Sequence, residues 1–132
     1  MEKYIQTIEN ALLAIGVEPE NARNADEGQW SIFRGEIEIF LDFWMTGDEE
    51  TWNYYWEEKN VPVFQVIAPI CNLPTFNTEE FYQALLELNL QLFYGSFMIK
   101  KEENMLCVKY RFTSNDFSVD HVVQAIESIS YY

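Results

Sequence analysis

The stretch that decides the fold runs from Ala68 to Phe112: APICNLPTFNTEEFYQALLELNLQLFYGSFMIKKEENMLCVKYRF. It predicts the end of a strand, a proline-marked loop, an amphipathic helix over about 78–93, and a β-hairpin of strands 96–101 and 105–112. Thr78 is a good helix N-cap, and Gly95 ends the helical region. Apolar residues cover several sides of this helix, so we expect it to be heavily buried: Phe81, Leu85, Leu86, Leu88, Leu90 and Leu92.

The rest of the chain predicts a helix near each end and three strands between them. Isoleucine and leucine at helical spacing indicate a helix over 2–15, which Gly16 ends because glycine tolerates a positive φ. The polar residues 17–28 predict a connecting loop. From Glu36 to Met45 apolar and acidic residues alternate, as in a strand with one buried face. The remaining expected elements are a short strand at 30–33, a largely buried strand at 61–70 and a helix at 118–130.

The segment 46–60 is the hardest to interpret. It contains the turn signal Gly47-Asp48-Glu49-Glu50, followed by WNYYWEE, in which alternate aromatics lie on one side of an extended chain. We prefer a hairpin extension here, with a short helix as the alternative.

The resulting order of elements is α–β–β–β–α–β–β–α. Successive strands are joined as hairpins rather than through βαβ crossovers. The sequence therefore predicts an α+β fold, with a mainly antiparallel sheet packed against helices, in a single domain over 1–132.

The charge of the chain limits its partners. It carries 8 basic and 22 acidic residues, a net charge of −14. Nucleic acid and anionic membranes both require clustered Lys and Arg, so neither is an expected partner. Two interpretations of the acidic residues remain. They form a solvated surface that keeps the protein soluble, or they form an acidic face that steers a basic partner. With no signal peptide and no apolar run of membrane-spanning length, we expect a cytoplasmic location.

The sequence contains no recognisable catalytic, metal or cofactor motif. His121 is the only histidine; it follows Asp120 beside the apolar stripe of the last helix, which is typical of a surface histidine. Cys71 and Cys107 lack metal-binding spacing, and both lie in apolar contexts that are typical of buried free thiols. The five glycines are scattered and form no phosphate loop. We therefore expect no enzyme, no metal site and no cofactor.

Asn89 is a polar residue among the leucines of the predicted helix over 78–93. One interpretation is that it bonds backbone at the edge of the packing between helix and sheet. The other is a polar contact that fixes the register of a dimer.

A group of aromatic residues is the best candidate for a binding site, because aromatic side chains often dominate the energy of interfaces. Its members could instead pack a hairpin onto the sheet; a subunit or partner interface is the second interpretation, and ligand capture is the third. The group comprises Phe40, Trp44, Trp52, Tyr54, Tyr55 and Trp56.

The order of elements resembles the bacterial type III secretion chaperone-like fold, and the motifs resemble its YbjN-type branch. The resemblance extends over nearly the whole chain, although the segment 46–60 is longer than the turn that the family has at this place. The motifs are Trp30 with Gly35, Ala68-Pro69 with Pro74, LLELN at Leu85–Asn89, Gly95-Ser96-Phe97 and the closing Tyr131-Tyr132. The resemblance implies a small acidic protein that commonly dimerises. Type III chaperones hold a secreted protein along hydrophobic grooves, whereas the resemblance to YbjN-type proteins implies a regulatory role.

Three functions follow from these observations. The first is a non-enzymatic chaperone-like or regulatory module that holds a protein partner on an apolar surface. The second is an acidic immunity-type or inhibitor protein that blocks a basic partner surface, and the third is an enzyme with an unrecognised site. We also expect a homodimer, because the chain has more large apolar side chains than one sheet face and three helices readily bury.

Overall fold

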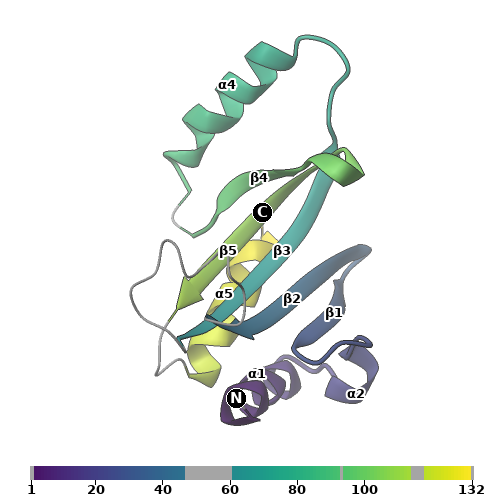
Figure 1. Cartoon of the computed structure of the whole chain (residues 1–132), viewed down its shortest axis with the longest axis vertical. Coiled ribbons are helices and arrows are strands. Elements are labelled where there is room, and N and C mark those ends of the chain that lie inside the picture. Colours follow the sequence, from purple (N-terminus) through teal and green to yellow (C-terminus); the bar gives the residue numbers. More distant parts are fainter. Residues whose placement is uncertain (1, 47–60, 93, 114–117, 132) are drawn as a thin grey trace.

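The computed structural model describes residues 2–46, 61–92, 94–113 and 118–131. Its α+β architecture confirms the predicted fold class and the order of the main elements (Figure 1). The helices are α1 (Glu2–Ala14), α2 (Pro19–Ala22), α4 (Thr78–Asn89) and α5 (Val119–Tyr131). The strands are β1 (Gln29–Arg34), β2 (Ile37–Met45), β3 (Pro62–Asn72), β4 (Ser96–Lys100) and β5 (Met105–Thr113), with the short 3₁₀ turn η1 (Lys101–Glu103) before β5.

The five strands form one antiparallel sheet in the order β1-β2-β3-β5-β4, so that β1 and β4 are its edges. The alternation predicted for β2 places Ile39, Leu41 and Phe43 on the buried face. The central strand β3 is buried continuously from Pro62 to Ala68, as its unbroken apolar sequence indicates. A bulge near its end, between Pro69 and Cys71, shifts its register with β5.

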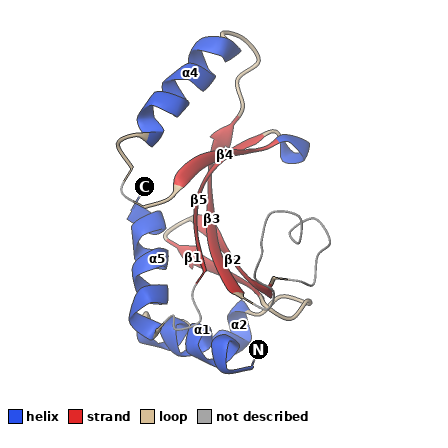
Figure 2. Cartoon of the chain, turned by 60° about the vertical axis from the view of Figure 1, so that its left-hand side comes forward, coloured by secondary structure: helices blue, strands red, loops and turns tan. Residues whose placement is uncertain are grey.

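Helices α1 and α5 lie on one face of the sheet and enclose the core with it (Figure 2). The apolar stripe predicted for the last helix is confirmed, because Val122, Ile126 and Ile129 are fully buried. The core combines residues from these two helices with residues from β1, β2, β3 and β5: Ile8, Ala11, Leu12, Trp30, Ile32, Ile39, Leu41, Phe43, Phe64, Val66, Ala68, Val108, Val122, Ala125, Ile126 and Ile129.

Several local predictions were wrong. The region 17–28 is not only loop, since α2 begins at Pro19, whose fixed φ suits the first turn of a helix. The helix predicted for 78–93 ends at Asn89. Thr78 is its first residue rather than its N-cap; Asn77 occupies that position in the left-handed region (φ 54°) and makes no capping hydrogen bond through its side chain.

The segment 47–60, including the predicted hairpin extension, lies outside the described residues. Its two neighbours in the sequence are joined to each other. The backbone N–H of Thr46 donates to the carbonyl of Val61 at 2.9 Å, and the N–H of Val61 donates to Oγ1 of Thr46 at 2.9 Å. Thr46 and Val61 therefore continue the pairing of β2 with β3 by one step.

Candidate functional site

Helix α4 differs from the other long helices because it has no buried residue. It lies beyond β4, clear of α1 and α5 (Figures 1 and 2). The expectation that this helix is heavily buried was wrong: Leu86 is 72% exposed, Leu88 45% and Leu90 91%. Leucine on several sides of a short helix is typical of burial, but the described part of the chain does not cover these side chains.

A groove of about 230 Å³ lies between α4 and β4. Its walls are almost entirely apolar, and Leu86 and Ile99 connect it to the exposed surface, since Ile99 is itself 43% exposed. We call this groove, together with Leu86, Leu88, Leu90 and Ile99, the α4 surface. The groove is lined by Tyr82, Leu85, Leu86, Asn89, Phe97, Met98, Ile99 and Leu106.

Two local features hold α4 beside the sheet. Oδ1 of Asn89 accepts a hydrogen bond of 2.8 Å from the backbone N–H of Phe97, so the prediction that Asn89 bonds backbone is confirmed. Gly95 (φ 82°) packs so closely on β5 that an added Cβ would lie 2.2 Å from the carbonyl oxygen of Lys109. The chain between α4 and β4 is thus anchored at both Asn89 and Gly95.

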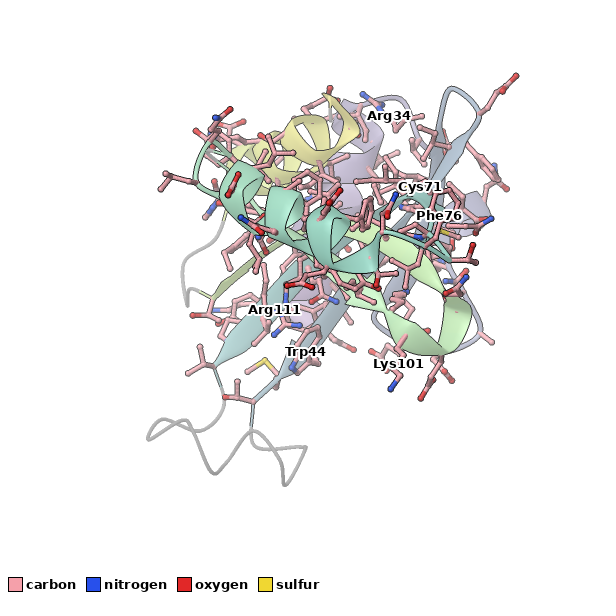
Figure 3. The ribbon with its side chains drawn as sticks, turned by 90° about the horizontal axis from the view of Figure 1, so that it is seen from above. Arg34, Trp44, Cys71, Phe76, Lys101 and Arg111 are labelled. Carbon is pink, nitrogen blue, oxygen red and sulfur yellow. The ribbon has the colours of Figure 1, made fainter. Side chains whose placement is uncertain are left out.

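The face of the sheet opposite α1 and α5 carries the two described members of the predicted aromatic group. Phe40 and Trp44 are half-buried on β2, and each lies beside a cation. Nζ of Lys100 is 5.5 Å from the centre of the Phe40 ring, and Cζ of Arg111 is 5.4 Å from that of Trp44. Figure 3 shows Trp44 and Arg111 side by side, away from α5. We call this surface the open face.

A polar network crosses the open face between the two aromatic residues. Asp42, Gln65 and Arg111 are neighbours in the pairing of β2, β3 and β5. Arg111 donates from Nε to Oε1 of Gln65 at 2.8 Å, and Nε2 of Gln65 donates to Oδ2 of Asp42 at 3.3 Å. Burial raises the pKa of Asp42, while the hydrogen bond from Gln65 and the charges of Lys100 and Arg111 act in the opposite direction.

Phe40 and Trp44 lie on the same face of β2 as Asp42; Phe40 comes two residues before it and Trp44 two residues after it. The other four members of the aromatic group, Trp52, Tyr54, Tyr55 and Trp56, lie outside the described residues.

The arrangement of His121 is that of a packed residue rather than an isolated surface histidine. Its ring stacks on Phe112 with centroids 3.9 Å apart and planes inclined by 11°. In the described ranges, no three His, Cys, Asp or Glu side chains come together as a possible metal site.

The two cysteines have different environments. Cys107 is buried, and burial raises its pKa. Cys71 is exposed, so the expectation of a buried thiol was wrong at this position. It lies beyond the bulge in β3, where the strand leaves the core.

A second polar cluster, which the sequence analysis missed, lies between α1, α2 and β1; its Glu9 and Trp30 are buried and its Arg23 is exposed. Glu9 on α1 accepts hydrogen bonds of 2.7 Å from both Nε and Nη2 of Arg23, and one of 3.0 Å from Nε1 of Trp30. The hydrogen bonds from Arg23, more than that from Trp30, hold the pKa of Glu9 below its usual range. These hydrogen bonds join Arg23 and the core residue Trp30 to α1, so the role of the cluster is structural.

Comparisons with known proteins do not assign the chain to a family. No protein-family model matches the sequence, and no curated protein matches it. Within the described residues, no helix is both long and apolar enough to cross a membrane.

Proposed function

We propose that this protein is a non-enzymatic, chaperone-like or regulatory protein-binding module, and that the α4 surface is where it binds. The exposure of Leu86 and Leu90 is the observation that carries this proposal. An isolated helix of 12 residues is marginal in water, and burial of each leucine contributes about 1.5–3 kcal/mol. Contact with a second chain would stabilise α4 by covering these side chains.

We propose that a second copy of the chain occupies this surface, so that the protein is a homodimer. A standard interface takes about 800 Å² from each partner. The exposed apolar side chains available for such a contact are the leucines of the α4 surface, with Phe76 (74% exposed) before α4 and Tyr94 (37%) after it in the sequence. The net charge of −14 opposes association, but screening limits its reach to about 8 Å at physiological salt.

Sedimentation of the wild type and of matched variants tests this proposal. We expect a dimer at micromolar concentration, and we expect Leu86→Asp to give monomers because it places a carboxylate in the apolar contact. Leu13→Asp is the control, since Leu13 is 50% exposed on α1. Trp44→Asp tests the open face instead. A wild type that stays monomeric at high micromolar concentration, or a dimer that only Trp44→Asp dissociates, would contradict the proposal.

An acidic inhibitor that blocks a basic partner is the alternative, and one observation favours it. Among the described residues, only Glu9 and Glu127 form ion pairs, with Arg23 and Arg34, so most described carboxylates remain available. The two functions differ in their dependence on salt. Binding through the α4 surface should change little between low and high salt, whereas charge mimicry should weaken steeply.

A further inference from the structure

Basic side chains gather on the open face, although the chain as a whole has a net charge of −14. Lys109 and Arg111 alternate along β5 with Tyr110, which packs against the core, so both basic side chains lie on the opposite side of the sheet. Lys100 reaches the same face from β4, since its Nζ lies over the ring of Phe40. The open face therefore carries a local excess of positive charge.

Lys109 is the unusual member of this group. It is half-buried, and among the described residues no carboxylate forms an ion pair with it. Burial lowers the pKa of Lys109, and the charge of Arg111 lowers it further. Asp42, a carboxylate on the same face, accepts a hydrogen bond from Gln65 instead. A half-buried ammonium beside a second cation costs free energy unless an anion compensates its charge.

Arg111 is held in a fixed orientation. Oε1 of Gln65 accepts hydrogen bonds from both Nε and Nη2 of Arg111, and the Trp44 ring lies against the guanidinium. A fixed side chain loses little conformational entropy when it binds a ligand. Several positive charges match a doubly charged oxyanion better than a single carboxylate, and a phosphate group carries about −1.5 to −2 charges at pH 7.

We propose that the open face binds the phosphate group of a small molecule, with Lys109 and Arg111 as its main contacts and Lys100 as the third cation. This inference goes beyond the proposed function and does not depend on self-association. The net negative charge of the chain permits such binding, because salt limits the reach of its repulsion to about 8 Å at physiological concentration.

Titration with inorganic phosphate at constant ionic strength, followed by nuclear magnetic resonance, tests the site. We expect saturable shifts at Lys109 and Arg111 and a rise in the pKa of Lys109, because a bound anion favours the ammonium form. Lys109→Gln should weaken phosphate binding at least about tenfold, as for a lost charge-assisted hydrogen bond. Lys101→Gln is the matched control, since it removes the same charge from the exposed turn η1 and should leave the affinity nearly unchanged.

Lys109→Arg keeps the charge and should keep most of the affinity, which separates loss of the contact from loss of the fold. Acetate, with its single charge, should bind more weakly than phosphate. Shifts that rise linearly without saturation would overturn the inference, as would equal losses of affinity in Lys109→Gln and Lys101→Gln. Acetate that binds as tightly as phosphate would overturn the assignment of a phosphate group.

Discussion

The hydrogen bond of 2.8 Å from the backbone N–H of Phe97 to Oδ1 of Asn89 joins helix α4 to the edge strand β4. The N–H of Phe97 points away from β5 and would otherwise be an open donor on a sheet edge, where another strand could pair. Asn89 therefore orients α4 and protects the edge with the same atom.

Replacement of Asn89 should loosen α4 without unfolding the sheet. We expect Asn89→Ala to lower the free energy of unfolding by about 1 kcal/mol, as for a typical lost hydrogen bond, and to accelerate hydrogen exchange at the Phe97 amide. Asn89→Asp keeps an acceptor and should retain much of that protection. Gln83→Ala, which removes a hydrogen bond to Glu87 on the exposed side of α4, is the control. Equal protection of Phe97 in Asn89→Ala and the wild type would show that the bond is not maintained in solution.

Gly95 should be far less tolerant of substitution than Gly16, although both have a positive φ. An added Cβ at Gly16 meets nothing within 4 Å, whereas at Gly95 it would lie 2.2 Å from the backbone oxygen of Lys109. We expect Gly16→Ala to cost about 1–2 kcal/mol from the backbone conformation alone. Gly95→Ala should cost about 3 kcal/mol or more, because β5 must also shift. Urea unfolding measures both, and similar costs would contradict the close packing of the Gly95 turn on β5.

The Glu9 cluster predicts a pH dependence of stability. Because the pKa of Glu9 is lower in the folded protein, its contribution is fully present above its unfolded pKa of about 4.3 and is lost as the pH falls through the folded value. Near pH 7 we expect Glu9→Gln to be destabilised by about 1–2 kcal/mol. The difference from the wild type should shrink below about pH 4.

Urea unfolding at a series of pH values gives this difference directly, with Glu2→Gln as the control because Glu2 is exposed on the same helix. A difference that stays constant down to about pH 3 would exclude a role for the ionised Glu9 carboxylate.

The two thiols should react at different rates. We expect a thiol reagent to modify exposed Cys71 rapidly and buried Cys107 slowly, since burial both hinders access and raises the pKa of Cys107. Cys71→Ser should remove the fast phase, and Cys107→Ser should leave it. Two equally fast phases in the native protein would mean that β5 opens on the timescale of the reaction.

The sequence predicted the sheet and the terminal helices well because their patterns are local. Alternation in β2 and the stripe Val122, Ile126 and Ile129 each follow from the period of one element. The burial of α4 could not be predicted in this way. Leu86 and Leu90 show only that a surface needs covering, and the pattern is the same whether the cover comes from this chain or from another.

Contacts between distant polar residues were also beyond the sequence analysis. Glu9 meets Arg23 and Trp30, which lie 14 and 21 positions away. Asp42 on the polar face of β2 was predicted from alternation, but its connection to Gln65 depends on the register of β2 with β3. No periodic pattern specifies such a register by itself.

The most direct test of the proposed function is to observe the contact of α4 between two chains. In a mixture of isotopically labelled and unlabelled protein, filtered nuclear Overhauser spectra report only protons of different subunits that lie close together. We predict cross-peaks from the methyl groups of Leu86 and Leu90 to α4 and β4 of the other subunit. A dimer whose intermolecular cross-peaks arise at Phe40 and Trp44, with none at α4, would contradict the account.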